Sequence, residues 1–265
     1  MKNALVAALV AACGTLVLAQ DAPRSVALTD SQMEEFLLHA AIVTTHAASK
    51  GITGSRRATL SDGTRTHDAH IQAVDEYQSR FVGPQGVELN FHDSWMYNVA
   101  AYKIDRMIGL NLIPPTVKRM YDGKGAAFTW WVDDVQMDEE ARIKKKIEVP
   151  NAELWNRQMF VLRVFDQLIG NTDRNLGNLL ITSDWRIFAI DHTRAFRLAR
   201  SIQTPANVTR CDRQMLERMK ALDKTTLKSA IAPFTYTDEI TALLARRDEI
   251  VKILEKAGPA ALYDR

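Results

Sequence analysis

Three polar residues in the middle of the chain, Asp173, Asn178 and Asp191, offer the groups that phosphate chemistry requires. Phosphoryl transfer needs a carboxylate near the attacking hydroxyl and oxygen ligands that hold a divalent cation on the phosphates. Asp173 stands in a polar loop, Asn178 follows it just before an apolar run, and Asp191 ends the next apolar run. The residue types and their order therefore predict a site for metal-assisted phosphoryl transfer.

The flanking segments must bring these side chains together. Apolar residues at helical spacing predict a buried helix over Asn151–Ile169, and two short apolar runs predict strands over Leu179–Ile181 and Arg186–Ile190. A tight hairpin of these strands returns Asp191 to the side of Asn178. The alternative is that the polar residues only cap turns and a helix. Three polar groups set between apolar runs are hard to explain as surface, so we favour a site.

The remaining patterns predict an α+β fold with two lobes. A small antiparallel sheet with one helix laid across it precedes the charged, turn-like stretch 133–148, and mostly helical structure follows it. The predicted helices are Thr29 or Asp30 to His39, Asp93 or Ser94 to Ile108, Asp212–Leu222, Thr225–Ala232 and Thr237–Lys256. The predicted strands are Ala41–His46, Arg57–Leu60, Arg65–Val74, Val117–Tyr121 and Ala126–Val132, with a polar connection up to about Asn90.

The polar segment resembles the catalytic and metal loops of a known superfamily. Residues 171–178, which read Asn-Thr-Asp-Arg-Asn-Leu-Gly-Asn, and residues 190–196 are similar to those loops in the atypical kinases. That group includes the phosphatidylinositol 3-/4-kinases, the HipA-type toxin kinases and the secretory-pathway casein kinases. Residues 100–109 and 114–117 resemble the helix and following strand of their N-lobe.

The resemblance implies a two-lobed kinase-like fold that uses ATP with Mg²⁺ or Mn²⁺. It makes Asp173 the catalytic base and makes Asn178 and Asp191 the metal ligands. It gives Arg174 the role of an ion-pair partner or a phosphate-facing cofactor contact. The implied reaction moves the γ-phosphate to a hydroxyl of a protein, a lipid or a sugar.

A glycine-containing loop near the N-terminus occupies the place of the loop that covers the phosphates. Its glycines, Gly51 and Gly54, let backbone amides approach a phosphate, and Lys50 and Ser55 add donors. We expect these four residues to contact the nucleotide. An ordinary hairpin loop is the alternative.

One feature of these kinases is missing from the sequence. They hold the α- and β-phosphates with a strand Lys that is paired to a helix Glu, whereas Gln72 and Asn98 stand near those positions here. A lone buried charge would cost several kcal/mol, roughly 3 or more, so the joint loss of both charges is coherent. We expect Gln72 and Asn98 to form a neutral hydrogen-bonded pair near the nucleotide, with Lys50, Arg56 and Arg57 as replacement cations.

We expect mainly structural roles for the nearby histidines and tryptophans. His67 and His70 lie three apart on a predicted strand, so they point to opposite faces and do not share a metal. His192 is expected to orient the loop through a hydrogen bond. Trp130 and Trp131 are expected to pack where the lobes join, with an adenine slot as the alternative.

The first residues read as an export signal. Lys2 precedes the apolar stretch Ala4–Ala19, which is too short for a membrane span but suits a signal peptide cleaved after residue 19. The protein is then exported to a periplasm, to the outside or to a secretory-pathway lumen; lipid attachment at Cys13 is an alternative. The expected division is residues 1–19 signal peptide, 20–133 N-lobe and 134–265 C-lobe.

Bulk composition and cysteine content narrow the partners further. The net charge of +2, from 34 basic and 32 acidic residues, gives no electrostatic footprint for nucleic acid. Cleavage after residue 19 leaves only Cys211, which excludes an internal disulfide and a thiolate zinc cluster.

The competing functions differ in turnover and in substrate. The first is an ATP-dependent kinase. The second is a pseudokinase that binds nucleotide or a partner without turnover, which the missing Lys–Glu pair favours. The third is a kinase for small metabolites, similar to the aminoglycoside kinases.

Overall fold

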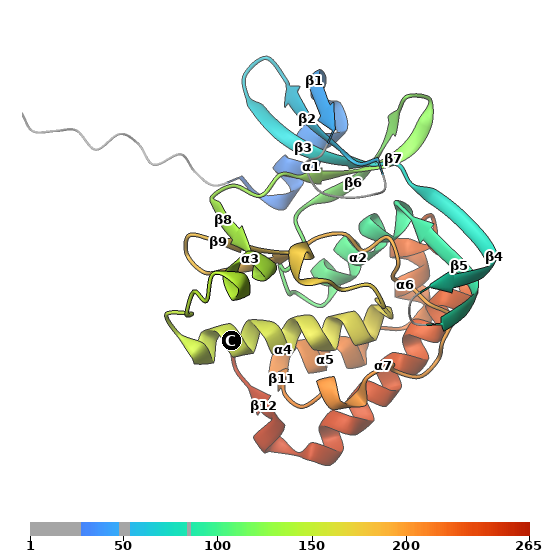
Figure 1. The fold of residues 1–265 in the computed structure, drawn as a ribbon. Coiled ribbons are helices and arrows are strands. Elements are labelled where there is room, and N and C mark those ends of the chain that lie inside the picture. The colour runs from blue at the N-terminus through green and yellow to red at the C-terminus, as the bar shows by residue number, and fades with distance from the viewer. Residues whose placement is uncertain (1–27, 48–53, 84–85) are drawn as a thin grey trace, which may run out of the picture.

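The computed structural model describes residues 28–47, 54–83 and 86–265 of the chain. Figure 1 shows an α+β fold in which a strand-rich upper part sits above a mostly helical lower part. The predicted fold class is therefore confirmed. The predicted signal peptide over residues 1–19 and the predicted lipid attachment at Cys13 fall outside the described residues, and the division at residues 133 and 134 stays a prediction.

The upper part is a five-stranded antiparallel sheet in the order β1-β2-β3-β7-β6. Its strands are β1 (Ala41–Ala47), β2 (Arg56–Ser61), β3 (Thr66–Gln72), β6 (Thr116–Tyr121) and β7 (Lys124–Trp130). Helix α1 (Asp30–His39) packs on β6 and β7, and it begins with a capping box between Thr29 and Gln32. Alternation along β3 buries Ala69 and Ile71 under α1, which leaves His70 and Gln72 on the opposite face.

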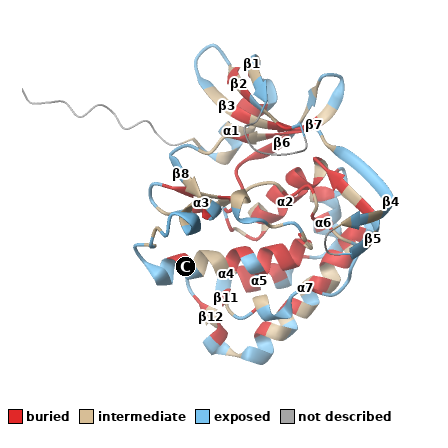
Figure 2. Ribbon diagram, in the orientation of Figure 1, coloured by how far each residue is buried: buried red, intermediate tan, exposed pale blue. Residues whose placement is uncertain are grey.

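A separate two-stranded ribbon follows the sheet, where the sequence predicts a polar connection. Strands β4 (Asp75–Gly83) and β5 (Gly86–Ser94) pair antiparallel and run down beside the helical part, with mostly exposed side chains (Figures 1 and 2). The prediction is wrong because neither strand has a continuous buried face. Stacking of Phe81 on Phe91, with ring centroids 4.1 Å apart, helps to hold the ribbon together.

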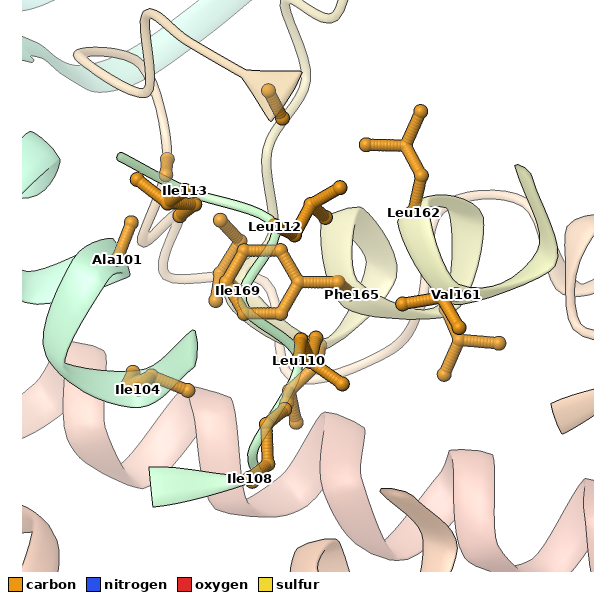
Figure 3. Close-up of a cluster of buried hydrophobic side chains, with 14 of the residues drawn as sticks. Ala101, Ile104, Ile108, Leu110, Leu112, Ile113, Val161, Leu162, Phe165 and Ile169 are labelled. Atoms are coloured by element: carbon orange, nitrogen blue, oxygen red, sulfur yellow. The ribbon is translucent and has the colours of Figure 1, made fainter. Parts of the chain in front are cut away.

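Helix α2 (Met96–Met107) joins the two parts. Trp95 makes no side-chain capping bond, whereas the Ser94 hydroxyl accepts from the Met96 amide at 3.3 Å, in agreement with the Ser94 alternative of the predicted cap. Figure 3 shows side chains from α2, such as Ile104, converging with Phe165 and Ile169 of α4. Their shared core fixes α2 against the element that leads into the Asp173 loop.

The lower part is built around helix α4 (Ala152–Ile169), which Asn151 caps and which is almost entirely buried on its second half. Hairpin β9 (Leu179–Thr182) and β10 (Ile187–Ala189) follows, as predicted. The stretch after residue 133 is not only turn: it forms β8 (Val135–Asp138), which pairs with β9, and α3 (Glu139–Lys144). The short strand β8 has few apolar residues, so the sequence pattern does not reveal it. Its pairing with β9 makes it a strand.

Three further helices close the lower part, as predicted. They are α5 (Arg213–Ala221), α6 (Lys224–Ile231) and α7 (Thr237–Ala257). A short parallel pair, β11 (Cys211–Asp212) with β12 (Leu262–Tyr263), ties the chain end to α5, and 3-10 turns occupy Leu176–Asn178, Pro205–Asn207 and Pro259–Ala261. None of the described helices is long and apolar enough to cross a membrane.

Candidate active site

A cleft of about 590 Å³ lies between the sheet and the helical part. Its walls come from β3 and β7 above, from α2 behind, and from the loops on either side of hairpin β9–β10 below. All three residues of the predicted site, Asp173, Asn178 and Asp191, line this one cleft. Their roles as base and metal ligands stay a prediction.

Asp173 lines the cleft and lies in the loop that follows α4. Gly170 ends the helix in the left-handed conformation, with φ of 63°, and the Asn171 side chain accepts from the Asp173 amide at 3.2 Å. The Asp173 side chain is 56% exposed and lies 3.5 Å from the Arg194 guanidinium. Partial burial raises its carboxyl pKa, Arg194 lowers it, and the charges of Asp191 and Asp93 raise it again.

Asn178 and Asp191 are brought together by the hairpin. Leu179 opposes Ala189 in the strand pair, and the Ile190 amide donates to the Asn178 carbonyl at 3.0 Å. Asp191 has a φ of 57°, a left-handed conformation uncommon outside glycine, and its carboxylate accepts from the Thr193 hydroxyl at 3.1 Å. This backbone turn sets the Asp191 carboxylate beside the Asn178 segment.

The donor set suits Mg²⁺ or Mn²⁺. Within the described part of the chain, no group of three or more His, Cys, Asp or Glu side chains gathers as a self-sufficient cage. Magnesium is usually bound by one or two carboxylates together with substrate phosphates and water. One carboxylate and one amide oxygen at the cleft floor therefore fit a cation that arrives with a nucleotide.

Asp93 is a cleft residue that the sequence analysis interpreted as a helix cap. Its side chain is buried, its Oδ2 accepts from Arg194 Nε at 2.8 Å, and its Oδ1 has no hydrogen-bond partner. A buried carboxylate oxygen without a donor is costly unless something else binds it. The signal in the sequence was an acidic residue shortly before a predicted helix that Ser94 could cap instead, which leaves Asp93 free for another role.

Arg174 requires a correction, because it does not line the cleft. Its Nε and Nη2 donate to the buried Asp166 carboxylate at 3.0 and 3.1 Å, and its Nη1 donates to the Ile190 carbonyl at 2.7 Å. Nη2 also lies 2.8 Å from His192 Nε2. The ion-pair alternative is thus confirmed, and the role of phosphate contact is wrong because all three nitrogens are already engaged.

His192 orients the loop, as predicted. A guanidinium nitrogen only donates, so His192 Nε2 accepts from Arg174 and the ring is neutral. Complete burial, and then the Arg174 charge, lower the pKa of His192 well below its usual value. The ring therefore acts as a fixed structural acceptor beneath Asp191.

Gln72 and Asn98 form the expected neutral pair. Asn98 Nδ2 donates to Gln72 Oε1 at 2.8 Å, and both side chains are buried. Asn98 Oδ1 accepts from the His192 amide at 2.7 Å. The pair therefore connects strand β3 through helix α2 to the residue that follows Asp191.

The predicted phosphate-covering loop is described only in part. Lys50 and Gly51 lie outside the described residues, whereas Gly54 has a φ of 65° and Ser55 is buried against the cleft. His70 also lines the cleft, two residues before Gln72 and on the same face of β3. Burial lowers the pKa of His70, and the Asp191 charge raises it in part. The sequence analysis separated His70 from His67 correctly but gave it no role.

The two tryptophans line the upper rim of the cleft and are also packed. Trp130 stacks on His67 with ring centroids 3.7 Å apart, and the Arg57 guanidinium lies 4.2 Å from the Trp131 ring centroid. Arg57 is also paired with Asp68. The Arg57 guanidinium therefore binds groups of the sheet, and Arg57 does not line the cleft.

Comparison with known proteins identifies the fold. Neither a protein family model nor a curated protein sequence matches the chain. Hydra Fam20, solved with sugar, matches with a TM-score of 0.66 at 14% identity, over 88% of this chain and 92% of that one. The Golgi casein kinase matches with 0.60 at 14%, over 89% and 78%. The kinase CtkA of Helicobacter pylori matches with 0.52 at 14%, over 86% and 98%.

The chain therefore has the fold of the atypical kinases. The likeness spans both parts of the structure, because most of this chain is covered in each comparison. The resemblance inferred from the residues around Asp173 is confirmed at the level of the fold.

Proposed function

We propose that this protein is an atypical kinase that transfers the γ-phosphate of ATP to a hydroxyl acceptor in a metal-dependent reaction. The observation that carries the proposal is the convergence of Asp173, Asn178 and Asp191 on one cleft of a kinase fold. A structure of the Golgi casein kinase holds Mn and ADP, which supports nucleotide and divalent-metal use by this fold.

In this proposal Asp173 accepts the proton of the acceptor hydroxyl. Its half-exposed carboxylate can reach an acceptor at the cleft mouth, and its raised pKa makes it a stronger base than a free aspartate. Arg194 ties Asp173 to Asp93, so the base is held in place by an ion pair.

Asn178 and Asp191 would hold the cation through one amide and one carboxylate oxygen. A bound Mg²⁺ or Mn²⁺ supplies positive charge that offsets the negative charge of the phosphates. Thr193 fixes the Asp191 carboxylate, and the Ile190–Asn178 backbone bond keeps the two ligands adjacent. Asp93, which has one oxygen without a hydrogen-bond partner, also lines the cleft and offers a third oxygen ligand.

The described lining of the cleft offers the nucleotide little positive charge. Among the described residues that line the cleft, Arg194 is the one Arg or Lys side chain, and it is already paired with two carboxylates. Gln72 and Asn98 can bind phosphate oxygens only as neutral donors. Lys50 of the covering loop is therefore proposed as an additional cation.

The second candidate is a pseudokinase, which the Gln72–Asn98 hydrogen bond specifically favours. A neutral pair holds phosphates more weakly than the usual Lys–Glu pair, so binding without turnover is physically reasonable. It predicts nucleotide binding with no transfer.

A transfer assay separates the two candidates. Purified protein is incubated with γ-labelled ATP and Mg²⁺ or Mn²⁺, with itself, casein and a sugar mixture as acceptors, beside Asp173→Asn. The kinase proposal predicts incorporation that falls at least about 100-fold in the variant, since general base catalysis contributes roughly that much or more. Equal incorporation by both proteins, with Asp173→Asn fully folded, contradicts it.

A further inference from the structure

A second pocket lies beside the Asp173 loop and shares no lining residue with the cleft. It has a volume of about 170 Å³, and its wall includes Gly170, Asn171 and Thr172, the three residues directly before Asp173. Arg246 and Arg197 also line it. A single buried water needs a space of roughly 10–15 Å³, so the pocket can hold a five-atom oxyanion together with water.

Arg246 is the most buried cation in this wall. It projects from α7, is 1% exposed, and donates to the backbone carbonyls of Leu168, Arg197 and Ala199. Its Nη2 has no acceptor, and no carboxylate of the described residues lies within ion-pair distance of it. Burial lowers the pKa of Arg246 to about 10, so the guanidinium still carries its charge at neutral pH.

Arg197 places a second incompletely satisfied guanidinium in the same wall. Its Nε pairs with Glu88 at 2.9 Å, and its Nη1 donates to the His92 carbonyl at 2.7 Å. Its Nη2 is buried and, like that of Arg246, has no acceptor. Arg246 and Arg197 therefore both line this small pocket, and each keeps one buried guanidinium nitrogen without an acceptor.

The one carboxylate in the pocket wall does not neutralise these donors. Asp166 is bound by Arg174 through both of its oxygens, and Asn171 Nδ2 donates to its Oδ1 at 2.9 Å. Its charge is thus compensated within the loop that carries Asp173. Arg197 has Glu88 as its counter-charge, whereas the buried Arg246 guanidinium has none among the described residues. A buried charge without a counter-charge is costly, and an anion in the pocket removes this cost.

From these contacts we propose that the pocket binds a small tetrahedral oxyanion, either free phosphate or the phosphate of a small phosphomonoester. Such an anion would accept from Arg246 and Arg197 and would contact the Asn171–Thr172 segment. Because the next residue is Asp173, occupancy orders the loop that carries the proposed base. The site is thus a regulatory one, beyond the proposed transfer reaction.

The mouth of the pocket provides a variant that leaves the buried arginines in place. Gln203 is exposed and lines the pocket, so Gln203→Glu adds a negative charge there with almost no change of shape. Gln214→Glu is the matched control, because Gln214 is exposed on α5 and does not line the pocket. Asp191→Asn tests whether any binding belongs to the cleft instead.

The experiment follows thermal unfolding of the full chain during titration with inorganic phosphate, and separately with glycerol phosphate, against chloride at equal ionic strength. EDTA is present, so that no cation bridges phosphate to the acidic cleft. We expect a saturable rise in Tm for wild type, Gln214→Glu and Asp191→Asn, and at least tenfold more phosphate to be needed for Gln203→Glu. A rise with phosphate alone identifies the free ion, and a rise with both identifies the phosphate group. No saturable rise, the same midpoint in Gln203→Glu, or loss of the rise in Asp191→Asn overturns the proposal.

Discussion

Arg194 is the residue through which the chemistry of Asp173 can be tested most sharply. Its guanidinium lies 3.5 Å from Asp173 and 2.8 Å from Asp93. It lowers the pKa of Asp173, against burial and against the charges of Asp191 and Asp93. Replacing it with glutamine therefore raises the pKa of Asp173 further above its usual value.

The size of the effect follows from the distance and the exposure. Two unit charges 3.5 Å apart interact by about 1.2 kcal/mol at the dielectric constant of water, which is appropriate because Asp173 is more than half exposed. Salt screening reduces this energy, so the rise in the pKa of Asp173 should reflect a loss of at most about 1.2 kcal/mol of ion-pair energy.

Two measurements report the direction of this change in the pKa of Asp173. NMR titration of the Asp173 carboxyl carbon reports the pKa directly. A base must be ionised to accept a proton, so the acid limb of kcat/KM moves to higher pH in Arg194→Gln. Arg194→Lys keeps the charge and should move both readings less. Asp93→Asn removes a neighbouring negative charge and should lower the pKa of Asp173. An unchanged or lowered pKa in Arg194→Gln refutes this reading of the site.

Two further predictions concern the supports of the site. Asn98→Ala removes the donor to Gln72 Oε1 and leaves the buried His192 amide without its Asn98 acceptor. An unmet buried hydrogen-bonding group costs about 1–3 kcal/mol, so urea unfolding should show a loss of at least about 1–3 kcal/mol, whereas exposed Asn156→Ala changes little. A loss below about 1 kcal/mol would mean that the pair is not formed. Arg174→Met leaves the buried Asp166 carboxylate without its cation and should cost about 3–5 kcal/mol by the same assay. Arg163→Met, on the exposed face of α4, is its control, and equal effects of the two changes would contradict the buried ion pair.

The sequence predicts best where one face of an element is strongly apolar. Helix α4 and hairpin β9–β10 are set by dense apolar runs, so their ends, and with them Asp173, Asn178 and Asp191, could be placed in advance. The Gln72–Asn98 pair was also predictable, because removal of two buried partner charges leaves only a neutral pairing.

Elements without a buried face escape this reasoning. Strand β4 is exposed along most of its length, so no alternation distinguishes it from a polar connection. The place of Asp93 in the cleft was missed for the same reason, because it depends on the path of β5. The role of Arg174 was open because its partner Asp166 lies on α4 among apolar neighbours, where the sequence suggests only packing.

Metal-dependent nucleotide binding tests the central claim most directly. Binding of ATP and of ADP is measured by calorimetry on wild type and on Asp191→Asn, with Mg²⁺, with Mn²⁺ and with EDTA. The account predicts that wild type binds nucleotide much more tightly with metal, and that Asp191→Asn loses this gain while it keeps the wild-type fold. Equal, metal-independent binding by the two proteins would contradict the placement of the cation at Asp191.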